Sequence, residues 1–248
     1  EAVEQTWDVR INPEDIPEIP WTKAELLKAK SEGYLLILRI NEDAEGQSLD
    51  LNRMKTILEP KLQELGQTHI FRGWTNWSNE TFDKESPRLK TPKASWSLVM
   101  KEVDPNSTMK NYLAQTIFLR EKAQKEQLLS REDLEASSDK AIAQLVKQRF
   151  PKSSIKALTV SNTTTEWQFA AELLSNLPVN QKLRRTPAEI AYDAFTVFAS
   201  TDNHERILQN HYDWSNRRLS DGSPVCLGHF ASPGLFVSGW YPFYASDD

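Results

Sequence analysis

The strongest local arrangement of ligand-binding groups in this chain is a polar turn with a lysine close behind it. Asn106, Ser107 and Thr108 follow Asp104-Pro105, and Lys110 comes two residues later. A turn of this kind begins helices, and the free N–H groups of a helix start hold phosphate, sulfate or carboxylate when hydroxyls and an ammonium lie nearby. The sequence therefore predicts either an anion-binding site or ordinary helix capping by Asn106 or Ser107, with Lys110 in solvent.

Potential metal ligands gather toward the C-terminal end of the chain. They are His204, His211, Cys226 and His229. Three histidines and a cysteine suit zinc, but their spacings match no known zinc motif, so we expect no bound metal. Cys226 paired with His211 or His229 is an alternative nucleophilic dyad, although its apolar neighbours favour a buried, inert thiol.

Motifs of the common nucleophile and cofactor sites are missing from the sequence. It has no Gly-x-Ser-x-Gly elbow, of which Val237-Ser238-Gly239 is only a fragment. It also has no Gly-x-Gly-x-x-Gly fingerprint and no phosphate-binding Gly-Lys-Ser/Thr loop. The sequence thus indicates no cofactor and leaves the catalytic residues, if there are any, unassigned.

Two tryptophans, Trp74 and Trp77, lie in a polar stretch between Gly73 and Asn79. Exposed aromatic rings among amides stack on sugars or anchor a protein partner. The alternative is that both rings fold back as a lid over the core. These residues are the candidate aromatic surface of the chain.

Periodicity and capping patterns predict the elements that must position these residues. Helices are expected over 22–32, 51–65, 108–128, 130–149, 165–176 and 186–200, and strands over 34–40, 68–72, 96–103 and 157–161. Thr22 and Thr186 each begin a capping box, and Asp221-Gly222 marks a hairpin. Residues 178–185 are expected to be a linker, and Pro60 to kink or divide its helix.

These elements predict an α+β fold with a helical middle and a β-rich C-terminal segment. Residues 1–20, which carry three prolines, are expected to be an extended arm that Trp7 and Ile11 attach to the body. Residues 21–248 are expected to form one compact domain, with a possible insertion over 150–185. A division of the chain near 150–185 is the main alternative.

Composition limits the classes of protein to which the chain can belong. Its hydrophobic fraction of 39% and charged fraction of 26% are typical of soluble globular proteins, and the run Leu35–Leu38 is too short to cross a bilayer. A net charge of −5 gives no footprint for duplex nucleic acid, and Lys182, Arg184 and Arg185 are either a local basic patch or a solvated loop. One cysteine favours a reducing cytoplasm, with a trimmed signal segment as the alternative.

Two groups of residues give the chain a family resemblance. The first is Trp96-Ser-Leu-Val-Met-Lys101 with Pro105-Asn-Ser-Thr108, Lys110 and Gln115; the second is Asp221-Gly222, Val225, Gly228, Phe230, Ser232, Gly234, Leu235 and Val237. With these motifs the chain resembles a family of uncharacterised bacterial proteins common in candidate-phyla genomes. The likeness covers 34–128 and 186–240 and departs from the pattern at His229 and Ala231. It implies a shared fold and no particular reaction.

The sequence favours a soluble, non-catalytic binding or interaction protein of unknown ligand. A protein partner, a small anion and a sugar are the candidate ligands, whereas duplex nucleic acid and membranes are not expected. The alternative is a metal-independent hydrolase or transferase that uses the turn from Asn106 to Lys110.

Overall fold

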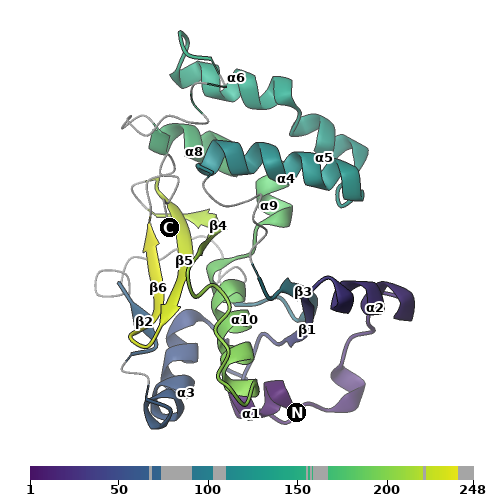
Figure 1. Ribbon diagram of the computed structural model, residues 1–248, viewed down its shortest axis with the longest axis vertical. Helices are drawn as coiled ribbons and strands as arrows, with labels where there is room; N and C mark the ends of the chain where they lie inside the picture. The colour runs from purple at the N-terminus through teal and green to yellow at the C-terminus, as the bar shows by residue number, and fades with distance from the viewer. Residues whose placement is uncertain are drawn as a thin grey trace. The chain divides into compact units, whose positions relative to one another are not determined.

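A computed structural model describes residues 1–66, 69–73, 91–102, 110–154, 156, 158, 167–219 and 222–239 (Figure 1). The fold is mixed α+β, as the sequence predicts. The chain forms two compact units. Unit 1 comprises Glu1–Val103, Thr186–Asp213 and Leu227–Val237, and unit 2 comprises Asp104–Arg185, Trp214–Cys226 and Ser238–Asp248.

Helix α10 (Pro187–Ser200) is the central element of unit 1, and every residue from Pro187 to Phe198 except Glu189 is buried. It packs against α1 (Ala2–Trp7), α3 (Leu51–Glu64) and β1 (Tyr34–Arg39), and α2 (Lys23–Ser31) also packs against β1 (Figure 1). Thr186 begins α10 with the predicted capping box, because its side chain accepts from Glu189 N–H. A helix this apolar is stable only inside a core.

The N-terminal segment departs from the expected extended arm, since residues 2–7 are helical and only a short 3₁₀ turn, Pro13–Asp15, follows. Trp7 is fully buried, stacks on Tyr192 with ring centroids 4.7 Å apart, and donates from Nε1 to Thr196 Oγ1 at 3.0 Å. The expectation is therefore wrong for these residues, because burial of an aromatic side chain against α10 favours a helical turn. Residues 12–20 are exposed.

Strands β1 (Tyr34–Arg39) and β3 (Ser95–Met100) form a two-stranded antiparallel sheet in unit 1. Their register pairs Tyr34 with Met100 and Arg39 with Ser95. Ile37 and Leu38, on opposite faces of β1, are both buried, whereas Leu36 is 38% exposed. The strand predicted over 34–40 is thus confirmed as β1, which pairs with β3 in the described part of the chain.

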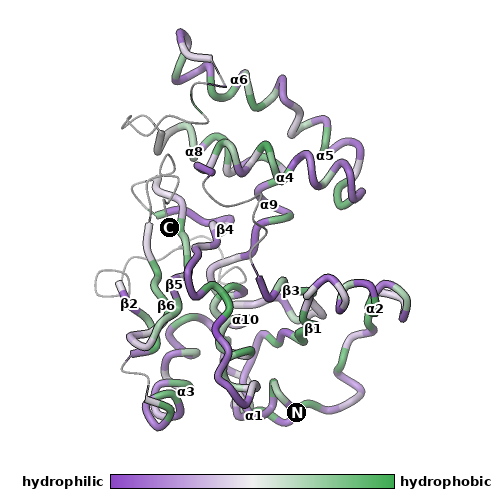
Figure 2. The backbone as a smooth tube through the Cα atoms, viewed as in Figure 1, coloured by the Kyte–Doolittle hydropathy of each residue, from purple (hydrophilic) through white to green (hydrophobic). Residues whose placement is uncertain are grey.

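Four further strands form a second sheet in the order β2-β6-β5-β4. Their bounds are Phe71–Arg72 (β2), Tyr212–Arg218 (β4), Pro224–Ala231 (β5) and Gly234–Gly239 (β6), and β2 is parallel to β6. The hairpin expected between β4 and β5 is closed by Leu219 N–H donating to Ser223 O, and Gly222 supplies a φ of +85°. Figure 2 shows β4 mostly in the colour of hydrophilic residues.

Unit 2 contains five described helices. They are α4 (Tyr112–Glu126), α5 (Arg131–Ala136), α6 (Asp139–Arg149), α8 (Trp167–Ser175) and α9 (Pro178–Leu183). The helix predicted over 130–149 is two helices, because the Ser138 side chain accepts from Ala141 N–H and starts α6 anew. The strand predicted over 157–161 lies largely outside the described residues, and Leu158 is helical.

The linker predicted over 178–185 is also wrong, since Pro178–Leu183 is helix α9. Proline at the first position of a helix costs no hydrogen bond, so Pro178 starts this helix and does not prevent it. Asn180 on α9 is fully buried and donates from Nδ2 to Leu174 O at 2.8 Å. The helix is fixed by this buried contact, which has no signature in the local sequence.

Candidate functional site

Unit 1 has a pocket of about 680 Å³ at the C-terminal end of α10. Its lining comes from Lys101, which follows β3, from Ser200 to Arg206, and from Gln209. Nearly the whole wall is thus one continuous stretch of chain that follows α10, a helix that is buried along most of its length. Every lining side chain is polar or charged.

Side chains of this stretch cap the end of α10. The last carbonyls of a helix have no partner within the helix, so they need donors from elsewhere. Thr201 Oγ1 donates to Val197 O at 2.9 Å, and His204 Nδ1 donates to Phe198 O at 3.2 Å. Glu205 N–H in turn donates to Thr201 Oγ1 at 2.8 Å. These bonds hold the stretch against the helix end and give the pocket a fixed wall.

The hydrogen bond of His204 to Phe198 O indicates which ring nitrogen carries a proton. A carbonyl oxygen only accepts, so Nδ1 carries the proton, and in the neutral ring Nε2 keeps a lone pair. The ring also lies on Phe198, with centroids 5.1 Å apart. Its backbone is left-handed, with φ of +48°, and Leu208 has φ of +60°. Such conformations cost on the order of 1 kcal/mol each and often mark functional sites.

Charges of both signs line the pocket. Lys101 Nζ lies 2.7 Å from Glu205 Oε1, and both side chains are partly exposed. The Arg206 guanidinium lies over two rings, 4.7 Å from the centroid of Phe198 and 5.7 Å from that of Phe230. Burial lowers the pKa of this guanidinium, which is therefore a partly desolvated cation. With Asp202, the lining carries two cations and two anions when His204 is neutral.

The turn that the sequence singled out is not part of this pocket lining. Asn106, Ser107 and Thr108 are outside the described residues. Helix α4 begins at Tyr112, and its N-cap is Asn111, whose Oδ1 accepts from Ala114 N–H at 3.0 Å. The expectation that Asn106 or Ser107 caps this helix is therefore wrong, because a second good capping residue follows the turn. The ammonium of Lys110 lies 5.7 Å from the Phe118 ring centroid.

The start of α4 is buried within unit 2. Asn111 and Tyr112 are 1% exposed, Leu113 is fully buried, and Asn111 Nδ2 donates to Leu158 O at 2.9 Å. The first N–H groups of α4 are thus closed to a dissolved anion. An anion site at Asn106–Lys110 that relied on this helix start loses its main physical support.

The histidines predicted as possible metal ligands have other contacts. His229 Nδ1 accepts from Arg72 Nη2 at 2.9 Å, and its ring stacks on Tyr212 with centroids 6.0 Å apart. Cys226 is 2% exposed. Among the residues that the structure describes, no group of three or more His, Cys, Asp or Glu side chains is placed to hold a metal ion.

The two other predicted surfaces are the tryptophan pair and the basic patch. Trp74 and Trp77 lie outside the described residues. The basic patch or solvated loop expected around Lys182 and Arg184 is wrong, because α9 turns Arg184 inward, where it is 7% exposed. Its guanidinium lies 4.5 Å from the Tyr112 ring centroid and donates from Nε to Asn180 Oδ1, while Lys182 pairs with Asp133 at 2.7 Å.

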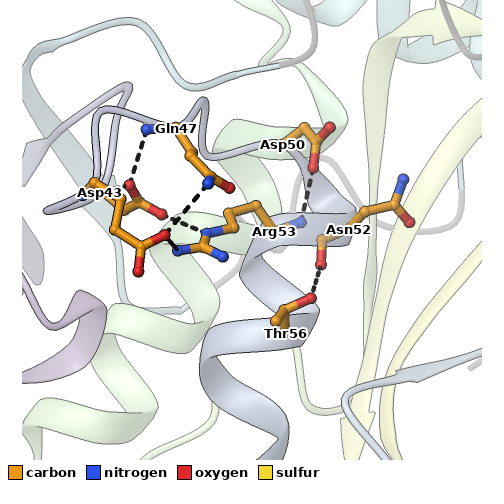
Figure 3. A network of polar contacts seen from close by, with 7 residues as sticks. Asp43, Gln47, Asp50, Asn52, Arg53 and Thr56 are labelled. Carbon is orange, nitrogen blue, oxygen red and sulfur yellow. Dashed lines mark hydrogen bonds and ion pairs between the residues drawn. The ribbon is translucent and has the colours of Figure 1, made fainter.

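An acidic loop between β1 and α3, which the sequence did not single out, is closed by an arginine (Figure 3). Asp43 Oδ1 accepts from Glu45 N–H and Gln47 N–H, each at 2.9 Å, and Asp43 Oδ2 pairs with Arg53 Nε. Burial raises the pKa of Asp43, but these hydrogen bonds outweigh it, so the pKa is lowered. Arg53 also pairs with Glu45 at 3.0 Å. The carboxylates of Asp43 and Glu45 thus stabilise the conformation of the loop.

No protein-family model, curated protein or solved structure matches this chain. None of the described helices is long and apolar enough to cross a membrane. The pocket of unit 1 is therefore the feature from which a function can be inferred. The sequence feature that could have revealed this pocket is the run Ser200-Thr-Asp-Asn-His-Glu-Arg206. It is dense in polar and titratable groups and directly follows an apolar helix.

Proposed function

We propose that this protein is a non-catalytic binding protein that holds a small polar molecule in the pocket at the end of α10. The observation that carries the proposal is the pocket itself, whose volume of about 680 Å³ falls in the range typical of small-molecule sites. Most such sites are lined mainly by apolar groups, whereas this lining is polar throughout. The lining favours a ligand that forms several hydrogen bonds or ion pairs.

The way the wall is held supports a binding role. Thr201 and His204 are fixed by hydrogen bonds to the carbonyls of α10, and Arg206 is fixed by two phenyl rings. A site whose groups are already ordered loses less conformational entropy when a ligand binds. The pocket is therefore preorganised along most of its length.

A matched pair of variants tests the proposal. Gln209→Tyr places a bulky ring in the lining, whereas Asn210→Tyr makes the same change at the next residue, which is exposed and outside the lining. We expect a screen of small polar metabolites by thermal shift to find a compound that raises the melting temperature of the wild type, because a ligand that binds only the folded state stabilises it. The shift should vanish in Gln209→Tyr and persist in Asn210→Tyr.

Two outcomes would overturn the proposal. One is that no compound in the screen raises the melting temperature beyond a matched salt control. The other is that both tyrosine variants keep, or both lose, the shift, since the pocket would then not be the binding site. A hydrolase or transferase that uses Asn106–Lys110 stays the alternative, and its signature would be conversion of a screened compound into product.

We also propose that the protein works in a reducing cytoplasm and shares its fold with the bacterial family whose motifs it resembles. The single cysteine, Cys226, is buried and fits a reducing compartment. Two motif glycines are sterically required here. A Cβ at Gly228 would lie 2.0 Å from His211 O, and one at Gly234 would lie 2.5 Å from His69 O. Their recurrence in relatives is expected if the same backbone contacts recur.

A further inference from the structure

We infer that one face of the sheet formed by β1 and β3, together with the segments at its two ends, is the interface through which this chain binds a second copy of itself. The inference goes beyond the proposed function, because it concerns this sheet and needs no ligand in the pocket. Three observations lead to it: an apolar sheet face, segments of opposite charge at the two ends of that face, and the size of the face.

The outer face of this sheet is apolar along its whole length. Arg39 marks the inner face, because its side chain pairs with Asp193 of α10. In an antiparallel pair, residues directly opposite each other lie on the same face, so the register gives the outer face six apolar residues: Tyr34, Leu36, Leu38, Trp96, Leu98 and Met100. Leu36, in the middle of the face, is 38% exposed. A sheet face that water covers usually carries polar side chains, so this face is suited to a protein partner.

Residues 12–20 form an acidic border at one end of the outer face. Trp96 Nε1 donates to Pro17 O at 2.8 Å, which holds this segment beside the pair Leu38–Trp96. Every residue of the segment is exposed, and its isoleucines, Ile16 and Ile19, are 39% and 42% exposed. The charged residues of the segment are all acids: Glu14, Asp15 and Glu18.

Helix α2 forms a basic border at the other end of the face. It packs against β1 and ends at Ser31, three positions before the pair Tyr34–Met100 (Figure 1). Its one acid, Glu25, accepts from Thr22 N–H in the capping box. Lys28 lies 3.8 Å from Glu32, and such exposed pairs contribute little. The helix has three exposed lysines, Lys23, Lys28 and Lys30.

This order of charges makes the surface complementary to itself. A two-fold axis through the middle pair, Leu36–Leu98, places the acidic border of each copy against the basic border of the other. Such a contact is isologous, as in most dimers with two-fold symmetry, and it brings opposite charges together at both ends. A different partner would need an apolar centre between one acidic and one basic end, which this chain already has. Charge complementarity therefore favours a second copy.

The size of the sheet face requires that both borders take part. Two strands of 6 residues each extend over about 20 Å by 10 Å, or roughly 200 Å². A stable interface buries about 800 Å² on each partner. The acidic segment and α2 must supply most of the difference, so their charges lie within the contact and changes to them should decide whether the dimer forms.

Charge reversal at each border, followed by sedimentation velocity of the full chain, tests the inference. The arm variant combines Glu14→Lys, Asp15→Lys and Glu18→Lys, and the helix variant combines Lys23→Glu, Lys28→Glu and Lys30→Glu. We expect the wild type to form a dimer at low salt. Each variant alone should dimerise roughly tenfold more weakly or worse, because like charges then meet at both ends. An equimolar mixture of the two variants should regain the affinity, because each reversed border meets its complement.

Matched changes in unit 2 are the controls. Lys125→Glu, Lys140→Glu and Lys147→Glu together repeat the charge change of the helix variant on exposed residues, and should leave the dimer intact. Leu36→Gln should weaken the dimer, whereas Leu128→Gln, at a leucine that is 50% exposed, should not. Circular dichroism checks that each protein is folded, and Lys30→Glu alone replaces the helix variant if that variant is not.

Three outcomes would overturn the inference. A wild type that is monomeric at every concentration measured has no such interface, and the face then belongs to a different partner. A dimer that survives charge reversal at both borders uses another surface. A mixture of the two variants that stays monomeric shows that the borders do not meet in a two-fold contact. None of these results depends on ligand binding, so the dimer and the proposed function can fail separately.

Discussion

At the scale of single residues, Arg39 is a buried cation matched by two carboxylates of α10. It donates to both oxygens of Asp193, at 2.8 and 2.6 Å, and lies 3.4 Å from Glu189 Oε1. Asp193 is fully buried. We predict that Asp193→Asn lowers the free energy of unfolding by about 3–5 kcal/mol, because it leaves a buried charge without its main partner.

Urea denaturation of the Asp193→Asn protein checks this value. The control is Glu45→Gln, which removes an exposed partner of Arg53 and should cost less than about 1 kcal/mol. Equal losses of unfolding free energy in the two variants would show that burial does not determine how much an ion pair contributes to stability.

Asp43 gives a pH dependence at the same scale. Its pKa is lowered in the folded protein, so the unfolded chain binds its proton first as pH falls. The stabilisation is thus present above the unfolded pKa of about 3.9 and is lost as pH falls from there through the lowered folded pKa. We predict that the melting temperature of Asp43→Asn changes less between pH 7 and pH 3 than that of the wild type.

Asp15→Asn, an exposed change, should retain the acid dependence of the wild type. A drop in melting temperature of the same size in Asp43→Asn as in the wild type would show that Asp43 is not the source of the acid dependence.

The contrast between Asp43 and Arg39 shows which ion pairs can be predicted from a sequence. Asp43 and Arg53 are close in the chain, whereas Arg39 and Asp193 are 154 positions apart, and no local pattern pairs them.

At the scale of elements, the two capping boxes allow a comparison. Both Thr22 and Thr186 accept from the N–H three residues later, as the sequence predicts. α2 is largely exposed, while α10 is the centre of unit 1. We predict that Thr186→Ala lowers the free energy of unfolding by about 1 kcal/mol, the usual cost of a lost N-cap, and that Thr22→Ala costs less because α2 frays without disturbing the core.

Chemical denaturation of both alanine variants decides this prediction, and a larger loss of unfolding free energy in Thr22→Ala would refute it.

Capping was predictable because it depends on residues within one turn. The helical state of α9 was not, since it depends on the burial of Asn180 against Leu174 O. The division of 130–149 was also missed, although Ser138 is a capping residue, because the apolar period continues across it. Pro60 likewise lies inside one helix, α3, and does not divide it.

At the scale of the whole molecule, each compact unit is assembled from three separate segments of chain. Unit 1 requires residues on both sides of 150–185, since Thr186–Asp213 supplies α10. We predict that a single proteolytic cut between 150 and 185 does not yield two independently folded fragments. Limited proteolysis followed by size-exclusion chromatography and circular dichroism would test this, and recovery of two folded, separated fragments would refute it.

The fold class was predictable at this scale because composition and element types fix it. The division into units was not, because segments remote in sequence make each unit, and neither was the pocket, whose wall combines Lys101 with residues about a hundred positions later.

The side-chain caps at the end of α10 have a consequence for engineering. Thr201 and His204 anchor the stretch to the helix, whereas Asp202, Asn203 and Gln209 line the same wall and are exposed. Anchoring and lining positions are thus interleaved along one continuous piece of chain. A single short randomised cassette over 202, 203 and 209, with 201 and 204 kept, would reprogram which molecule is bound while the scaffold keeps its shape.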